Sequence, residues 1–196
     1  MTHHIYSTQA IILQNGVWGE SNRTFSFLTK DFGLVSASAQ GVREIRSKLR
    51  YSLKNFSHVQ VSLVRGKEMW RVVTVIPEES FNGMLNDYNK IIIFTRISKL
   101  LLRLVAGESH NEELFDFLLT LAQFLNTQEL DEQLLQSVEL LAELKIISLL
   151  GYAKESPALN VYFYSAPLEK STLKSFVACW KEARENVDYA LRESHL

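Results

Sequence analysis

The sequence has very few residues of the kinds that build disulfide or metal-held frameworks. Its one cysteine, Cys179, can form neither an internal disulfide nor a cysteine-rich zinc site. The five histidines are scattered, with His3 and His4 near one end and His195 at the other, so they supply no metal-binding constellation. We therefore expect no metal or other cofactor and no dependence on an oxidising compartment.

Long apolar runs are also lacking. Apolar runs such as residues 91–94 and 100–102 are soon interrupted by charge, and the first residues lack a charged region followed by an apolar one. We expect neither a signal peptide nor a membrane span. The sequence therefore predicts a soluble protein of the cytoplasm with no membrane partner.

Motifs of the common enzyme families are missing as well. There is no P-loop, no G-x-G-x-x-G, no H-E-x-x-H and no G-x-S-x-G. Cys179 falls within the last expected helix, where a buried structural thiol is favoured over a nucleophile. We therefore predict a protein that is not an enzyme and has no small-molecule substrate.

Neither sign of charge dominates the whole chain, but its two halves differ. The formal net charge is −1. Residues 1–80 carry ten Lys and Arg against six Asp and Glu, whereas residues 81–196 carry eleven against sixteen. These balances of +4 and −5 predict a basic domain attached to an acidic one.

The first part of the chain contains short runs of β-branched and aromatic residues separated by turn signals. Two of these signals, at residues 30–33 and 65–67, fit hairpin turns with glycine where positive φ is needed. Pro77 is expected to end the β region. Five antiparallel strands in about 75 residues match a small closed barrel such as the OB fold. The expected strands cover residues 6–13, 23–29, 34–39, 56–64 and 69–76.

After Pro77 the apolar period changes to about 3.6 residues, which predicts helices. They are expected over residues 87–105, from Asn111 onward, over 131–150 and over 169–192, with a loop at 152–168 that includes a short strand at 161–164. The predicted fold class is α+β. A five-stranded OB-fold barrel is expected over residues 1–78 and a helical domain over residues 79–196.

The strongest local feature is a basic cluster in the link between the third and fourth strands, which only Glu44 offsets. Because central strands and their loops form the binding face of such a barrel, cations here suit a phosphate backbone, and nearby aromatic rings suit unpaired bases. The alternative is a solvated loop beside core aromatic residues. The cluster contains Arg43, Arg46, Lys48 and Arg50, extended by Lys54; the aromatic residues are Trp18, Phe25, Phe27, Tyr51, Phe56 and Trp70.

A second cationic feature lies on the first long helix. Arg96, Lys99 and Arg103 follow an i, i+3, i+7 spacing and so share one helix face. We favour an ordinary solvated face, since a helix needs a polar side in any case. The alternative is a secondary track that lengthens the nucleic-acid site.

The order and spacing of several segments resemble the RecO family of bacterial recombination mediators. The resemblance covers residues 5–75 and, more loosely, 86–152, where the matching segments are Glu143-Leu144 and Leu149-Leu150-Gly151-Tyr152. In the first part they are Ala10-Ile11-Ile12-Leu13, Gly19-Glu20-Ser21-Asn22-Arg23, Phe27-Leu28-Thr29-Lys30-Asp31-Phe32-Gly33-Leu34-Val35, Ala39-Gln40-Gly41-Val42-Arg43 and Ser47-Lys48-Leu49-Arg50.

This resemblance implies an OB-fold domain followed by a helical domain, and binding of single- and double-stranded DNA at the nucleoid. It also implies annealing of complementary strands and partnership with RecR, with the tail of single-strand binding protein, and indirectly with RecA. Family members look basic at the same link, so the resemblance favours the nucleic-acid interpretation of the cluster. The DNA-binding residues expected in this way are Arg23, Lys30, Arg43, Arg46, Lys48, Arg50 and Lys54.

The chain departs from the family pattern in two places. Many relatives carry a four-cysteine zinc module after the Gly-Tyr that ends the third helix, whereas this chain has only the 152–168 loop, so it resembles a short, zinc-free variant. Some relatives have an Arg pair just before the Glu-Leu of that helix, thought to receive the tail of single-strand binding protein. Here those positions read Leu140-Leu141-Ala142, so the tail contact is either absent or placed elsewhere.

Two functions of different kinds remain open at this stage. The first is a DNA-binding mediator that anneals strands and helps load recombinase with RecR, without making or breaking a bond. The second is a protein-interaction adaptor in a repair complex, in which the barrel is a scaffold and the acidic half recruits partners. A hydrolase is disfavoured, because no carboxylate or histidine metal set is present.

Overall fold

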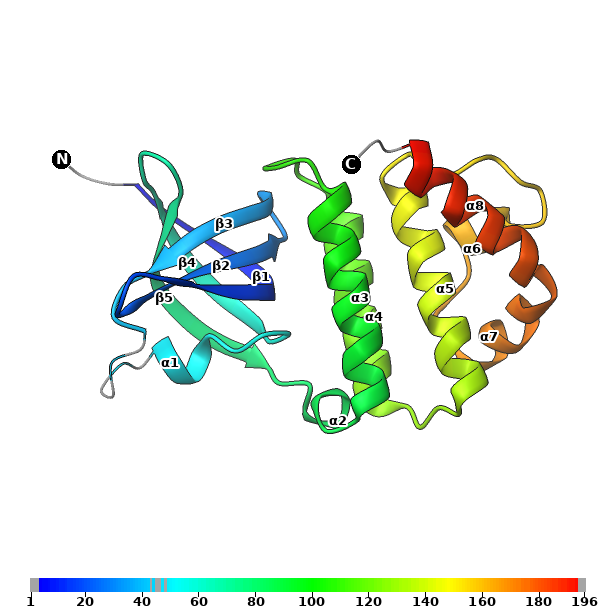
Figure 1. The fold of residues 1–196 in the computed structure, drawn as a ribbon, viewed down its shortest axis with the longest axis horizontal. Helices are drawn as coiled ribbons and strands as arrows, with labels where there is room; N and C mark the ends of the chain where they lie inside the picture. The colour runs from blue at the N-terminus through cyan, green and yellow to red at the C-terminus, as the bar shows by residue number, and fades with distance from the viewer. Residues whose placement is uncertain (1–3, 43, 45–46, 48, 194–196) are drawn as a thin grey trace. The chain divides into compact units, whose positions relative to one another are not determined.

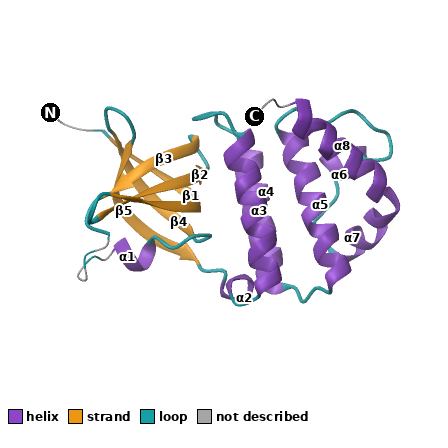
Figure 2. Ribbon diagram, in the orientation of Figure 1, coloured by secondary structure: helices purple, strands orange, loops and turns teal. Residues whose placement is uncertain are grey.

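The computed structural model describes residues 4–42, 44, 47 and 49–193. Its N-terminal part is a closed barrel of five strands in the order β1-β2-β3-β5-β4 (Figures 1 and 2). This confirms the predicted five-stranded OB-fold barrel followed by helices. The strands are β1 (Ile5–Trp18), β2 (Asn22–Thr29), β3 (Gly33–Ala39), β4 (His58–Arg65) and β5 (Trp70–Glu79).

The strand pairing makes β1 the longest element of the barrel. β1 pairs with β4 through its first half and with β2 through its second half, and its register shifts between Ile12 and Gln14. The predicted hairpins β2–β3 and β4–β5 are both formed. The barrel closes through a short parallel pairing of β3 with β5, in which Ala37 faces Trp70 and Ser38 faces Arg71.

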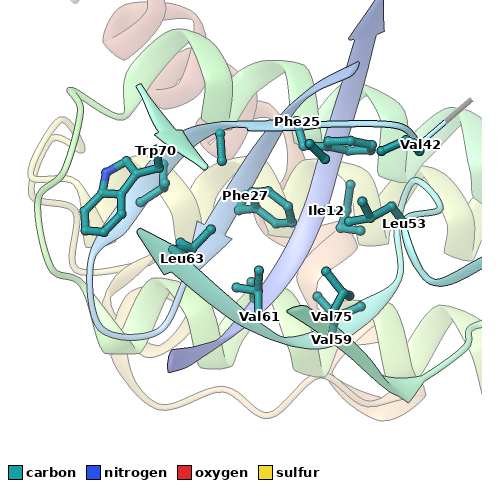
Figure 3. Close-up of a cluster of buried hydrophobic side chains, with 14 residues drawn as sticks. Ile12, Phe25, Phe27, Val42, Leu53, Val59, Val61, Leu63, Trp70 and Val75 are labelled. Carbon is teal, nitrogen blue, oxygen red and sulfur yellow. The ribbon is translucent and has the colours of Figure 1, made fainter. Parts of the chain in front are cut away.

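The barrel core follows the alternation expected of half-buried strands. Val59, Val61 and Leu63 of β4 point inward and are fully buried, while the intervening residues are less covered. Figure 3 shows Trp70 at one end of the buried cluster and Val42 and Leu53, from the link between β3 and β4, at the other. The link therefore completes the core at the end opposite Trp70.

The two short hairpin turns use glycine for different reasons. Gly33 adopts a φ of 69°, as predicted. Gly66 does not have positive φ, so that part of the prediction is wrong. Its amide instead donates to the Met69 carbonyl at 3.2 Å, and a Cβ on Gly66 would overlap that oxygen. Close backbone approach, rather than backbone conformation, favours glycine there.

Two of the long helices start at an aspartate that caps their first turn. Asp87 accepts hydrogen bonds from the amides of Asn89 and Lys90, and Asp131 accepts one from Leu134. The helices are α1 (Leu49–Ser52), α2 (Asn82–Leu85), α3 (Tyr88–Leu104), α4 (Glu112–Thr127), α5 (Glu132–Leu149), α6 (Asn160–Tyr164), α7 (Lys170–Phe176) and α8 (Trp180–Glu193), with a 3-10 turn at Val177–Cys179.

Three local predictions are wrong. Pro77 does not end the β region, because β5 continues to Glu79 with Pro77 opposite Val59, beside a register shift. Residues 161–164 form helix α6 rather than a strand, since consecutive Tyr162 and Phe163 are both buried, which strand alternation would prevent. The expected helix over 169–192 is broken at Val177–Cys179, and both α7 and α8 pack against α5.

The chain packs as two compact units that are interleaved in sequence. The first comprises residues 1–81 and 106–119, and the second comprises 82–105 and 120–196. The segment 106–119 is tied to the barrel by the Leu34 amide, which donates to the Gly107 carbonyl at 3.3 Å. The functional partition into residues 1–78 and 79–196 stays a prediction.

A pair of glycine substitutions tests how closely segment 106–119 packs on the barrel. Gly19 and Gly33 have nearly the same positive φ, but a Cβ meets nothing within 4 Å at Gly19, whereas at Gly33 it would overlap the backbone of Ser109. We expect Gly19→Ala to cost about 1 kcal/mol of unfolding free energy and Gly33→Ala about 2–4 kcal/mol. Urea unfolding of both variants measures the difference. Equal losses would show that Ser109 does not pack there.

His58 should make the first unit sensitive to acid. Its ring is buried and lies 6.0 Å from the ring of Phe115, and burial lowers its pKa below the ordinary 6.5, against the opposing effect of Glu78 and Glu79. Because the unfolded chain takes up a proton more readily, stability should fall as the pH drops below about 6.5, by up to about 1.4 kcal/mol per pH unit.

The variant His58→Gln should reduce this pH dependence, measured as unfolding free energy from pH 7.5 to pH 5. His110→Gln is the matched control, because His110 is exposed. A pH dependence equal to that of the unchanged protein in His58→Gln would contradict the assignment. The slope is compared rather than the absolute stability, since glutamine also changes the packing at residue 58.

Candidate nucleic-acid interface

Three of the predicted DNA-binding cations lie together. Arg23, Arg50 and Lys54 line a pocket of about 590 Å³ at the end of the barrel that the link closes. The rest of its wall is made by Asn15, Val42, Leu53 and Asn55. We call this site the basic pocket.

The barrel and its link position these cations in different ways. Arg23 faces Val17 and Ala39 in the strand register, two residues from buried Phe25, so it lies on the inward side where the barrel opens. Arg50 lies on α1, and Lys54 follows Leu53, whose side chain is buried in the barrel core. Burial of Leu53 thus fixes the segment that presents both link cations.

A hydrogen-bonded chain orients Arg23. Its Nη1 donates to Oδ1 of Asn15 at 3.0 Å, and Nδ2 of Asn15 donates to Oδ1 of Asn55 at 2.7 Å. The Nε of Arg23 is buried and has no hydrogen-bond partner among the described residues. Arg23 thus combines one oriented guanidinium nitrogen with one unsatisfied buried donor.

The electrostatics of the basic pocket favour an anion. Arg50 and Lys54 are exposed, and no acidic residue is among the described residues that line the pocket. Three cations around one opening, without a carboxylate in its wall, are suited to a phosphate backbone. The two asparagines were not predicted. The inward-facing position of Asn15 follows from its register opposite Phe25, which the sequence alone does not give.

Lys30 lies elsewhere, in the turn between β2 and β3. Its Nζ is 3.0 Å from Oε1 of Glu112 and 3.8 Å from Oδ1 of Asp116. The hydrogen bond to Glu112, followed by the charge of Asp116, raises the pKa of Lys30 above its ordinary value. Its charge is already matched by carboxylates of segment 106–119, and its role in DNA binding stays a prediction.

The other predicted cations and the nearby aromatic residues fall into three groups: outside the described residues, in the core, or exposed. Arg43, Arg46 and Lys48 lie outside the described residues. Most of the aromatic residues near the cluster belong to the core, as the simpler interpretation had it, and they are Phe25, Phe27, Phe56 and Trp70. Trp18 and Tyr51 are exposed, with 46% and 70% of their surface accessible.

The cations of the proposed secondary track are partly engaged inside the second unit. Nη1 of Arg96 is 3.0 Å from Oε1 of Glu139 on α5, and Arg103 donates to the carbonyl of Leu191 on α8 at 3.2 Å. Lys99 is exposed. These contacts lie within the second unit, and both the solvated face and the secondary track stay predictions.

The charge asymmetry between the halves of the sequence does not carry over to the compact units. Segment 106–119 adds four acids and no Lys or Arg to the barrel, so the first unit has ten cations and ten acids. The second unit has eleven cations and twelve acids. The local placement of cations, and not the net charge of a unit, therefore determines where an anion can bind.

The described part of the chain holds no cluster of three or more His, Cys, Asp or Glu side chains placed to bind a metal ion. Cys179 is half-buried rather than buried, in the 3-10 turn between α7 and α8. None of the helices in the described residues is both long enough and apolar enough to cross a lipid bilayer.

Comparison with known proteins gives two family matches along the chain. The model described as recombination protein O N terminal matches residues 1–81, and the one described as recombination protein O C terminal matches residues 85–156. Among similar proteins, the DNA repair protein RecO of Heliobacterium modesticaldum is 32% identical over 151 residues, covering 77% of this chain and 53% of the relative. That of Thermodesulfovibrio yellowstonii is 25% identical over 178 residues, covering 90% and 69%.

A closed five-stranded barrel with a cationic pocket, followed by helices, defines an OB-fold protein. The two matches fall on these same parts in the same order, and similar proteins carry the name of a DNA repair protein. The chain belongs to the RecO family of DNA repair proteins. It spans about half the length of the first curated relatives it matches.

The asparagine chain gives a test of how the basic pocket is built. In Asn15→Ala, Nη1 of Arg23 and Oδ1 of Asn55 both lose their partner, so we expect a loss of about 1–3 kcal/mol in unfolding free energy. Asn55→Ala leaves the Arg23 bond intact and should cost less. Chemical denaturation of both variants measures this. A larger loss for Asn55→Ala than for Asn15→Ala would contradict the proposed order of these hydrogen bonds, in which Asn15 links Arg23 to Asn55.

Proposed function

We propose that this protein is a DNA repair and recombination mediator whose barrel binds the phosphate backbone of DNA at the basic pocket. The observation that carries the proposal is the meeting of Arg23, Arg50 and Lys54 around one opening, with no acidic residue among the described residues of its wall. Arg43, Arg46 and Lys48 are close in sequence to Arg50 and stay predicted members of the DNA-binding set. Membership of the RecO family supports the proposal independently of this geometry.

Phosphate binding by Lys and Arg does not depend on base sequence or on strand number, so the pocket would accept both single- and double-stranded DNA. Neutralising phosphates on two complementary strands lowers their mutual repulsion, and this is the physical basis we propose for strand annealing. No covalent bond changes in this process, so the proposed function is not enzymatic. RecR, and the tail of single-strand binding protein, are proposed partners.

A second candidate function is that of an adaptor in a repair complex with little direct DNA binding. One observation favours it: the first compact unit carries no net charge, because the four acids of segment 106–119 offset the net positive charge of the barrel. An adaptor would still capture RecR but would not shift DNA in a titration at moderate salt. A DNA-binding mediator would do both.

Removal of the link cations tests the proposed function. Arg50→Gln combined with Lys54→Gln should lower affinity for single-stranded DNA roughly tenfold or more at 0.1 M salt, because two phosphate contacts are lost. The slope of log affinity against log salt should fall in magnitude by about 1.4, which is about 0.7 for each contact. Fluorescence anisotropy at several salt concentrations measures both quantities.

The matched control is Lys170→Gln combined with Lys174→Gln, which removes the same charge from exposed positions on α7 of the second unit. Affinity and slope should remain close to those of the unchanged protein. Lys30→Gln should also leave the slope unchanged, because Glu112 and Asp116 already pair with Lys30. If the two double variants behaved alike, the basic pocket would not be the DNA site.

A further inference from the structure

The barrel has a second cleft, and none of the described residues that line it also lines the basic pocket. It encloses about 600 Å³ between the turn that joins β1 to β2 and the turn that joins β4 to β5. Its principal wall residues are Trp18, Ser38, Arg65, Lys67, Met69 and Arg71. We call it the tryptophan cleft.

Barrel closure brings these residues together from separate parts of the sequence. Ser38 of β3 faces Arg71 of β5 in the short parallel pairing, and Trp18 is the last residue of β1. On the adjoining outward face of the barrel, Thr24 lies opposite Ser38 and Ser26 opposite Ser36. Ser38 itself is 2% exposed and its hydroxyl donates to the carbonyl of Trp70 at 3.4 Å, so this part of the wall is held in place by the β3–β5 pairing.

Trp18 differs from the other tryptophan of the barrel. Trp70 is 4% exposed and packs in the core, against Tyr6 at 5.3 Å and Phe32 at 5.7 Å between ring centroids. Trp18 is 46% exposed at the edge of the cleft. Met69 contributes its thioether to the same cleft, and Arg and Lys residues contribute their aliphatic stems. An exposed indole in this setting is suited to stacking on a planar aromatic ligand.

The β4–β5 side of the cleft is fixed in place. Arg65 donates to Oε2 of Glu108 at 3.1 Å, and Nε1 of Trp70 donates to Oε1 of the same carboxylate at 2.8 Å. The guanidinium of Arg65 also lies 5.3 Å from the Trp70 ring centroid. Since this wall is already ordered, little conformational entropy would be lost when a ligand binds.

Two cations of the cleft remain available. Lys67 and Arg71 are exposed, and neither has an ion-pair partner among the described residues. Glu68 is the one acid among the described residues that line the cleft, so its wall charge is positive. Positive charge beside an open aromatic face is the combination that binds single-stranded nucleic acid, where bases stack and phosphates pair with cations.

We propose that the tryptophan cleft binds an unpaired base of single-stranded nucleic acid, with Trp18 stacking on the base and with Lys67 and Arg71 contacting adjacent phosphates. This inference rests on the proposed function and deepens it. The basic pocket contacts only the backbone, whereas the cleft requires a base whose face is free. The cleft therefore gives the barrel a preference for single strands over duplex.

The test compares two probes of equal length, an oligothymidylate and an abasic oligonucleotide with the same phosphate backbone. Trp18→Ala should lower affinity for the oligothymidylate about tenfold, a typical effect of losing one stacked base, and leave affinity for the abasic probe unchanged. The salt slope should stay the same, since no charge is removed. Trp18→Phe should restore most of the affinity, because a phenyl ring also stacks.

Tyr88→Ala is the matched control, since Tyr88 is 77% exposed and belongs to the second unit. It should change neither affinity. An equal loss on both probes, or no loss on either, in Trp18→Ala would overturn the cleft proposal and leave the phosphate-binding proposal standing. If the unchanged protein bound neither probe at low salt, both proposals would fall together. Urea unfolding of Trp18→Ala confirms that the barrel is intact.

Discussion

Closure of the barrel by the parallel pairing of β3 with β5 is the constraint on which the candidate sites depend. Only two residue pairs make this contact, Ala37 with Trp70 and Ser38 with Arg71. The pairing places the Trp70 indole in the core and Arg71 in the cleft. Because the β3–β5 pairing is short, the opposite end of the barrel is filled by the link between β3 and β4. Burial of Leu53 in that link holds Arg50 and Lys54 at the mouth of the basic pocket.

Segment 106–119 determines which of the barrel's cations are available. Glu112 pairs with Lys30, and Glu108 holds both Arg65 and the Trp70 indole. Exposed ion pairs of this kind add little stability, but they remove positive charge from one part of the surface. Among the described residues of the barrel, the cations without a carboxylate partner line the basic pocket and the tryptophan cleft. A barrel unit with no net charge can in this way still present two local sites for an anion.

The sequence predicts the barrel well because its signals are local. Alternating side chains and turn glycines such as Gly33 define the strands, and capping residues such as Asp131 define helix starts. The sequence fails to predict features that depend on tertiary packing. One example is the break between α7 and α8, where the sequence has no Pro or Gly. For the site, Arg23 could be predicted, but its partner Asn15 and the setting of Trp18 could not, because each depends on strand register and barrel closure.

Phosphate contacts and base stacking respond differently when two strands anneal, and this difference bears on how a mediator could release its product. Backbone phosphates remain accessible in a duplex, so binding at the basic pocket would persist after annealing. A base that pairs within a duplex loses its free face, so binding at the tryptophan cleft would end. A barrel that combines both modes would hold unpaired strands more tightly than their product. Annealing would then itself weaken the complex, and release would require no chemical energy.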